Sequence, residues 1–213
     1  MLCQADASGE RPIVTGILTV EKDSPIYHEG DRADHWFEVV SGIVRTCRYQ
    51  ANGQRHITAF HFPDDVVGLD EGHYLESGEA VTEVTLRRHM NTVPDEILVK
   101  AWNKARENIF LISHKTATNR VAAFILGMAE RCKTPQLELP MSRSDIADHL
   151  NLTLHTVSRT ICDFARRRLI ALDGPQQLRI LDPDGLRCAA GEGDEEPRMI
   201  TAPDGATSSW PRT

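Results

Sequence analysis

Hydrophobic and polar positions divide the chain into a front part with strand-like patterning and a back part with helical patterning. From about residue 13 to residue 90, short apolar runs alternate with turn residues at intervals of roughly ten residues. Turn signals fall at residues 29–31, 41–42, 52–53 and 63–65. This spacing predicts an all-β first unit, a β-sandwich or jelly roll.

The strongest turn signal is the Asn52-Gly53 pair between the strand-like runs 44–49 and 56–60. Asn-Gly is the preferred pair for a two-residue type I′ turn, because both central residues take positive φ. We therefore expect a tight β-hairpin here. The residues expected to be buried on an earlier strand are Trp36, Phe37, Val39 and Val40.

Pro94 and Asp95 predict the start of a helix in which apolar residues recur at steps of three and four. Its expected contact residues are Leu98, Trp102, Ala105, Ile109 and Ile112. A single narrow seam of this kind is typical of a helix that pairs with another helix. The alternative is a helix that lies on the β-unit, and one helix can do both.

Beyond residues 113–116 the pattern widens into the apolar face of a second globular core. Its residues are Val121, Ala122, Phe124, Ile125 and Met128. We therefore expect a β-unit over 1–94, a pairing helix over 95–116 and a second domain over 117–188. The stretch 189–213 is acidic and poor in bulky residues, so we expect it to be disordered.

Residues 142–161 predict two short helices joined by a tight turn. Ile146, Ala147 and Leu150 form one apolar stripe on the first helix. Asn151 follows, and asparagine tolerates the left-handed conformation that a tight turn between helices needs. Thr153 offers a hydroxyl to cap the second helix.

The second helix has its inward positions at Val157 and Ile161. Its outer face therefore carries Leu154, His155, Ser158 and Arg159. A hydroxyl, an imidazole and a guanidinium in the first turns of a helix suit the reading of base edges in a major groove. The pair is interpreted as a helix-turn-helix.

The stretch after this helix indicates which type of helix-turn-helix unit the sequence contains. Residues 166–168 are three arginines, and two short apolar runs follow at 169–172 and 178–181, on either side of a turn at 173–175. Two such runs around a Gly-Pro turn predict a β-hairpin wing. The unit is therefore expected to be a winged helix-turn-helix.

Composition and charge fit this interpretation. The formal net charge of −7 is uneven, since residues 1–98 carry −9 and residues 99–188 carry +5. Phosphate affinity depends on the local face, but +5 over the back half is modest, so we expect weak non-specific DNA binding with a strong dependence on salt. No apolar run is long enough for a bilayer and the N-terminus lacks signal-peptide features, so we expect a soluble, cytoplasmic protein without a membrane partner.

An enzyme or small-molecule carrier is the rival class. The sequence offers no nucleophile elbow, Gly-rich phosphate loop or metal-binding histidine spacing, so we expect no enzymatic activity. The pairs Asp64-Asp65 and Asp70-Glu71 are interpreted as solvated turns. The five cysteines, which are odd in number and scattered, argue against a disulfide framework and a thiolate zinc site.

Residues 139–150, with 152–154 and 156–160 after them, resemble the Crp/Fnr superfamily of bacterial transcription regulators, in particular its FixK-type branch. Residues 120–124 resemble the segment that opens the helix after the family's dimerisation helix. The resemblance implies an α+β fold: an N-terminal β-roll of the cyclic-nucleotide-binding type, a long dimerisation helix and a C-terminal winged helix-turn-helix.

The resemblance also implies a homodimer that recognises a palindrome related to TTGAT-N4-ATCAA, in control of oxygen-limited, nitrogen-fixation or denitrification genes. Expected partners are double-stranded DNA, a second copy of the chain and RNA polymerase. Candidate DNA-binding residues are Ser142, Thr153, Leu154, His155, Ser158 and Arg159. In the family, the residue at the position of Arg159 meets a guanine, and the position of His155 usually holds Glu.

Departures from the family bear on cofactors. Cys3 is the only cysteine near the N-terminus, so the iron–sulfur cluster of Fnr-type oxygen sensors is not expected. Residues 67–79 contain no arginine to meet a cyclic phosphate, so the nucleotide site is interpreted as lost. We expect no cofactor. The alternative, a haem- or redox-dependent sensor of the same fold, draws on six histidines of the β-unit: His28, His35, His56, His61, His73 and His89.

Overall fold

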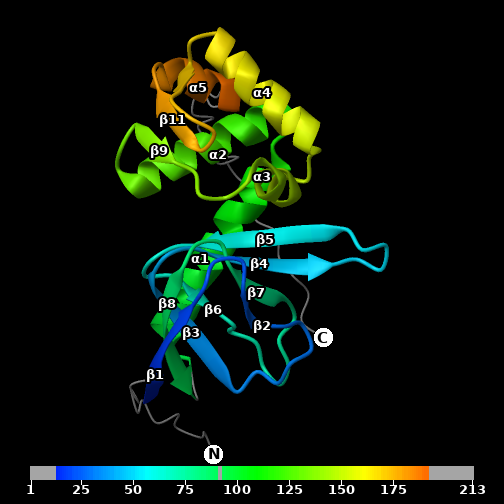
Figure 1. The fold of residues 1–213 in the computed structure, drawn as a ribbon, viewed down its shortest axis with the longest axis vertical. Helices are drawn as coiled ribbons and strands as arrows, with labels where there is room; N and C mark the ends of the chain where they lie inside the picture. Colours follow the sequence, from blue (N-terminus) through cyan, green and yellow to red (C-terminus); the bar gives the residue numbers. More distant parts are fainter. Residues whose placement is uncertain (1–12, 91–92, 192–213) are drawn as a thin grey trace, which may run out of the picture.

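The computed structural model describes residues 13–90 and 93–191, and Figure 1 shows a β-roll with a helical unit above it. The strands of the β-roll are β1 (Ile13–Val20), β2 (Pro25–Tyr27), β3 (His35–Ser41), β4 (Val44–Tyr49), β5 (Arg55–His61), β6 (Val66–Val67), β7 (Ser77–Ala80) and β8 (Val84–Met90). They form two antiparallel sheets in the orders β1-β8-β3-β6 and β2-β7-β4-β5. The expected jelly-roll architecture is confirmed.

Alternation along β3 places Phe37 and Val39 in the core between the two sheets. Trp36 points the other way but is also buried, with its ring stacked on His89 at a centroid distance of 4.0 Å. Val40 is 42% exposed, so its predicted burial is wrong. The register of β3 against β8 shifts between Val39 and Ser41, which takes Val40 out of the regular pattern.

The β4–β5 hairpin forms as predicted, but its turn does not. Tyr49 and Arg55 are the last paired residues, and the N–H of Gly53 donates to the carbonyl of Gln50 at 2.8 Å. Gly53 has a φ of +80°, whereas Asn52 does not take a positive φ. A type I′ turn requires positive φ at both residues, so the predicted turn type is wrong.

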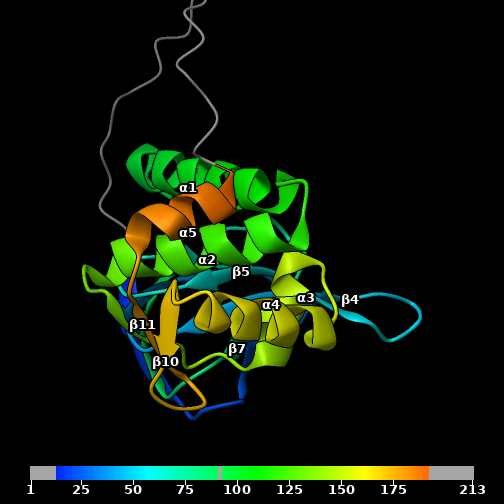
Figure 2. The same ribbon diagram turned by 90° about the horizontal axis from the view of Figure 1, so that it is seen from above.

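The helical unit contains α1 (Asp95–Ser113), α2 (Ala117–Cys132), α3 (Arg143–Leu150), α4 (Leu154–Arg166) and α5 (Pro183–Ala190). Strands β9 (Gln136–Glu138), β10 (Ile170–Leu172) and β11 (Gln177–Ile180) form a sheet in the order β10-β11-β9. Viewed from above, α1 lies along one side of the molecule, α3 and α4 lie toward the other, and α2 runs between them (Figure 2).

Two of these elements, β9 and α5, were not predicted. Helix α5 begins at Pro183 after Asp182, whose side chain accepts a hydrogen bond from the N–H of Gly185 at 2.9 Å. It continues to Ala190, so the prediction of disorder from residue 189 is wrong at its start. The remainder of that expected tail, residues 192–213, lies outside the described residues.

The apolar face predicted on α2 is buried, but its core is not separate from the β-roll. Val121 and Ile125 of α2 belong to one buried cluster with Ile161 of α4 and with Ile57 and Phe60 of β5. Figure 1 shows α3 lying directly over β5. The outer side of the β4–β5 hairpin is therefore part of the core of the helical unit.

Candidate DNA-binding surface

Helix α3 begins with a reciprocal cap between Ser142 and Asp145. The Ser142 hydroxyl accepts from the backbone N–H of Asp145 at 3.0 Å, and the Asp145 carboxylate accepts from the backbone N–H of Ser142 at 3.0 Å. The Ser142 hydroxyl also donates to this carboxylate at 2.8 Å. Ser142 is exposed, but its hydroxyl is already engaged within the protein.

The turn between α3 and α4 has the predicted conformation. Asn151 takes the left-handed region with φ 52° and ψ 51°. A contact that was not predicted holds the same turn: Arg120 of α2 donates to the carbonyl of Leu150 at 3.1 Å and to the carbonyl of His114 at 2.9 Å. This arginine ties the end of α3 to the segment that joins α1 and α2.

Helix α4 is capped by Thr153, whose hydroxyl accepts from the N–H of Thr156 at 3.1 Å. Val157 and Ile161 are buried as predicted, together with Phe164. The inward side of α4 thus holds it against α3 and α2 over its whole length. This leaves the opposite side available for contacts outside the molecule.

That outer side carries the predicted residues together. Leu154 is 51% exposed, His155 and Arg159 are exposed, and Ser158 is half-buried. Within the described part of the chain, no hydrogen bond or ion pair engages the side chain of His155, Ser158 or Arg159. The helix therefore presents a methyl-bearing side chain, a hydroxyl, an imidazole and a guanidinium that are free for contact with base edges.

The wing forms where the sequence predicted it, with β10 and β11 paired and the turn at residues 173–175 between them. Arg179 lies 3.3 Å from Asp173 across this turn. Strand β9 pairs with β11 and extends the wing to three strands. The wing and the outer side of α4 belong to one compact unit, as in a winged helix-turn-helix.

Helix α1 has two different faces. Lys100 donates to the carbonyl of Asp64 at 2.5 Å, and Lys104 pairs with Asp65, so one face lies on the β-roll. The other face is exposed and apolar, with Trp102 at 65% and Ile109 at 66% exposure. The helix thus lies on the β-roll and still leaves an unpaired seam, the combination that the sequence left open.

The other predicted seam residues differ from one another in their exposure to solvent. Leu98 is 43% exposed and Ala105 is exposed, whereas Ile112 is half-buried. Ala105, Ile109 and Ile112 all line a pocket against the β-roll. Val99 and Phe110, at 59% and 67% exposure, were not predicted to belong to the apolar face. They flank the seam by one position, so the exposed apolar face is wider than a strict heptad pattern gives.

Comparisons with known proteins agree with this geometry. A profile of the Crp-like helix-turn-helix domain matches residues 119–189, and one of the cyclic nucleotide-binding domain matches residues 17–89. The chain is 37% identical to the nitrogen fixation regulation protein FixK of Rhizobium meliloti (strain 1021), over 80% of this chain and 85% of that protein. FixK2 from Bradyrhizobium japonicum has a solved structure with a TM-score of 0.75 and 31% identity, covering 83% of this chain and 98% of that chain.

The chain belongs to the Crp/Fnr family, in its FixK-like branch. A second relative, the transcriptional activator protein FnrA of Stutzerimonas stutzeri, is 30% identical over 81% of this chain and 79% of that protein. The predicted family and fold are confirmed, and the chain is a DNA-binding transcription regulator of the Crp/Fnr type. Among its described helices, none has the length and apolar character needed to cross a bilayer.

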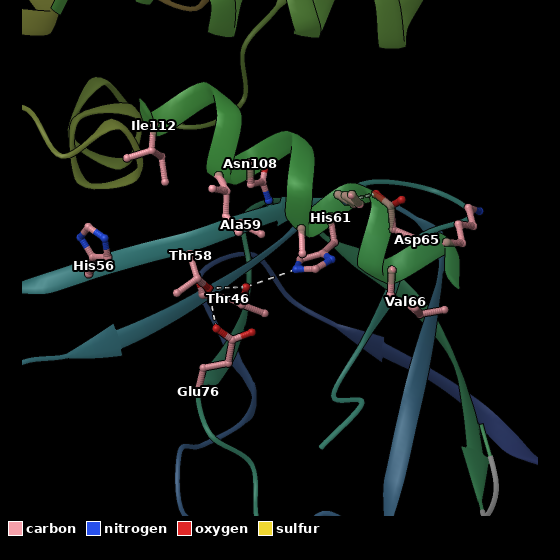
Figure 3. A pocket seen from close by; sticks show the side chains of 15 residues that line it. Thr46, His56, Thr58, Ala59, His61, Asp65, Val66, Glu76, Asn108 and Ile112 are labelled. Carbon is pink, nitrogen blue, oxygen red and sulfur yellow. Dashed lines mark hydrogen bonds and ion pairs between the residues drawn. The ribbon is translucent and has the colours of Figure 1, made fainter. Parts of the chain in front are cut away.

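This Crp/Fnr regulator has a pocket between the β-roll and α1, with a volume of about 360 Å³ (Figure 3). On one side of it, Thr58 donates to Glu76 at 2.5 Å, and the hydroxyls of Thr58 and Thr46 lie 2.8 Å apart. Burial raises the pKa of Glu76. His61 lies 3.2 Å from Thr46, and burial lowers its pKa to about 3.

These residues do not fit a cyclic nucleotide. No arginine is among the described residues that line the pocket, and Glu76 adds a carboxyl to a lining that would need a cation to hold a phosphate. Both lysines of the lining are engaged, Lys100 with the carbonyl of Asp64 and Lys104 with the carboxylate of Asp65. The pocket is thus lined by hydroxyls, imidazoles and apolar side chains, together with the carboxyls of Asp65 and Glu76 and the two engaged lysines.

Asp65 corrects one prediction about this regulator. It was interpreted as a solvated turn residue, but it is 5% exposed and pairs with Lys104 of α1 and with Arg131 of α2, the latter at 2.8 Å. Burial alone would raise the pKa of Asp65, yet these cations and the N–H of Phe62 lower it overall. Asp65 therefore joins the β-roll to both helices.

Proposed function

We propose that this regulator binds DNA as a homodimer and recognises a palindrome related to TTGAT-N4-ATCAA. The observation that carries the proposal is the outer side of α4, on which Leu154, His155 and Arg159 are exposed and unpaired. A helix with such a face, held from behind by a buried core, is suited to enter a major groove. Both halves of a palindrome are then read by two copies of one helix.

Each residue of this surface has a distinct part in the proposal. Arg159 donates two hydrogen bonds to a guanine, and Leu154 contacts a thymine methyl group. Ser158 and His155 add polar contacts to neighbouring bases. Ser142 and Thr153 stand at the N-termini of α3 and α4, where backbone N–H groups favour phosphate oxygens.

Dimerisation is proposed to use the exposed face of α1. The residues of the seam are Leu98, Trp102, Ala105, Ile109 and Ile112. Large apolar side chains that are two-thirds exposed are unusual in a helix that also lies on its own domain. A second α1 across a two-fold axis would remove them from water and set the two DNA-binding units side by side.

The names of the relatives support a physiological role. They include a nitrogen fixation regulation protein and a transcriptional activator. We propose that this chain acts in the cytoplasm as an activator of oxygen-limited, nitrogen-fixation or denitrification genes, with RNA polymerase as its partner.

The test is a binding selection on randomised duplex DNA with the purified full chain. The expected result is an enriched palindrome with a TTG core in each half and a fixed spacer. Enrichment of a single, unrepeated site would contradict the homodimer, and no enrichment would contradict sequence-specific binding. An Arg159→Ala variant, selected in parallel, should lose the guanine of the core.

A further inference from the structure

A group of ion pairs joins the β4–β5 hairpin to the first helix of the DNA-binding unit. Arg55, the first residue of β5, reaches two carboxylates of α3: its Nη2 lies 2.5 Å from Oδ1 of Asp145 and 2.8 Å from Oδ2 of Asp148. Its Nε also donates to Asp148 at 3.1 Å. One guanidinium of the β-roll thus holds two positions, one turn apart, on α3.

Arg45 of β4 strengthens the same junction. It is 8% exposed, and its Nη1 lies 3.4 Å from Oδ1 of Asp145 while its Nε donates to Glu79 of β7 at 2.8 Å. Asp145 therefore has one oxygen toward the β-roll and the other in the cap of α3 with Ser142. The start of α3 and the hairpin are fixed through the same carboxylate.

Deeper in the junction, apolar and polar contacts also hold α3 against the hairpin. His149, one turn further along α3, is 2% exposed and its Nδ1 lies 3.2 Å from the carbonyl of Ile57 in β5. Its ring also packs against Phe60 of β5 at a centroid distance of 5.1 Å. The side of α3 that carries Asp145, Asp148 and His149 thus rests on the hairpin, and α4 is packed on α3.

The chain between α1 and α2 spans only residues 114–116, which are not helical. A DNA-binding unit attached to the dimer through this connection alone would have freedom to swing. The hairpin supplies a further attachment, beside the pair between Arg131 of α2 and Asp65 of the β-roll. Because it contacts α3 directly, the hairpin contributes to the orientation of α4 relative to α1.

We propose that Arg55, assisted by Arg45, is a positioning residue for DNA recognition: it holds the two recognition helices of the dimer at one separation and angle, so that the protein selects one spacer length between half-sites. The proposal rests on the proposed function. One added base pair moves a half-site by about 3.4 Å and turns it by about 35°. A fixed pair of helices rejects that change, whereas a swinging pair follows it.

The experiment measures the affinity of the full chain for duplexes with identical half-sites and spacers of three, four, five or six base pairs, and for a single half-site. The variants are Arg55→Met and Asp148→Asn, which remove the pair from opposite sides and leave the capping residue Asp145 in place. Arg48→Met is the matched control, because Arg48 lies on the same hairpin, is exposed and pairs with Glu29 at 3.3 Å. It removes the same charge without touching α3.

We expect the unaltered protein and Arg48→Met to favour the four-base-pair spacer over its neighbours by ~10-fold or more, and both test variants to reduce this ratio to ~3-fold or less. Half-site affinity should stay within ~2-fold in Asp148→Asn and Arg55→Met relative to Arg48→Met. The ratio between spacers is the decisive quantity, because a lost charge of either sign changes the affinity for all of these duplexes alike.

Absence of palindrome binding by the unaltered protein would overturn the proposed function itself. If the unaltered protein binds the palindrome without a spacer preference, or both variants keep its preference, the positioning role is wrong. Loss of half-site binding in both variants would show that the ion pairs maintain the helix-turn-helix fold, which also overturns the proposal.

Discussion

The imidazole of His149 in α3 donates from Nδ1 to the carbonyl oxygen of Ile57 in β5, with 3.2 Å between the two atoms. His149 is also enclosed by Phe60 and Phe124, with ring centroids 5.1 and 6.0 Å away. Burial lowers the pKa of His149 to about 4. The neutral form is therefore the form that the folded protein holds.

This burial predicts that the stability of the folded protein decreases as the pH is lowered. Below the ordinary histidine pKa of 6.5 the unfolded chain takes up a proton that folded His149 refuses until about pH 4, so stability is complete above pH 6.5 and is lost through that window. The contribution of His149 to the unfolding free energy should be smaller by about 2 kcal/mol at pH 5 than at pH 7. Urea unfolding at both pH values measures the difference.

His149→Gln keeps a donor for Ile57 and removes the titrating group, so its stability should change less between these pH values. The control is His155→Gln, which alters an exposed histidine of α4 and should leave the wild-type pH dependence. Equal pH dependence in His149→Gln and the wild type would show that His149 is protonated in the folded protein.

Arg159→Ala should abolish the preference for the guanine of the half-site core. A guanidinium that binds guanine O6 and N7 contributes about 1–3 kcal/mol of discrimination, so the preference should fall by about one to two orders of magnitude. Gel shifts with each base at that position measure it. Arg166→Ala, on the same helix but paired with Asp163 at 2.8 Å, is the control and should weaken binding without changing the preferred base. A retained guanine preference in Arg159→Ala would contradict the assignment of Arg159 as the residue that binds this guanine.

His155→Glu should change the preferred base at one position of each half-site. A carboxylate only accepts hydrogen bonds, as from cytosine N4, whereas an imidazole has both a donor and an acceptor nitrogen. Binding profiles on half-sites varied at every base compare the variant with the native protein. His73→Glu makes the same change on the exposed surface of the β-roll and serves as control. Identical profiles would leave His155 with a phosphate contact only.

Ile109→Glu should convert the homodimer into monomers and abolish palindrome binding, because two carboxylates would meet across the two-fold axis in an apolar seam. Light scattering gives the mass of each species. Ile17→Glu is a matched control, since Ile17 on β1 is exposed to a similar degree, 72% against 66% for Ile109. A dimeric Ile109→Glu that binds DNA normally would place the interface elsewhere.

Cyclic AMP should not change the DNA affinity of the protein, because Glu76 lines the pocket and no arginine is among its described lining residues. The purified protein should also bind its palindrome when its absorption spectrum shows no Soret band, that is, when it carries no haem. Titration with cyclic AMP and an absorption spectrum test the two statements. A Soret band that persists after gel filtration would favour the haem-dependent alternative, with His56 and His61 as the histidines of the pocket.

Most of the fold could be predicted because its determinants are local. The stripe of Ile146, Ala147 and Leu150, the left-handed Asn151 and the capping Thr153 each follow from neighbouring residues, and the structure confirms all of them. The outer face of α4 followed by elimination, since burial of Val157 and Ile161 leaves only one side free. Helix and turn chemistry therefore defined the candidate surface.

The junction between the β-roll and α3 could not be predicted from local pattern. Asp145 and Arg55 are 90 residues apart, and each alone has the pattern of a surface charge. Asp65 was misinterpreted for the same reason, because its partners lie on two helices that follow much later in the chain. Pairing over such separations depends on tertiary packing, and helical or strand periodicity carries no information about it.

The core that the β-roll shares with the helical unit limits how parts of this protein can be fused to other domains. Phe60 of β5 and Phe124 of α2 belong to one buried cluster, so a cut between α1 and α2 divides a hydrophobic interior and not a flexible linker. If the helical unit were fused to a different sensor domain, Phe124 and the side of α3 that faces β5 would be exposed to water. A functional chimera therefore needs to carry the β4–β5 hairpin with it, or an equivalent surface redesigned to match α3.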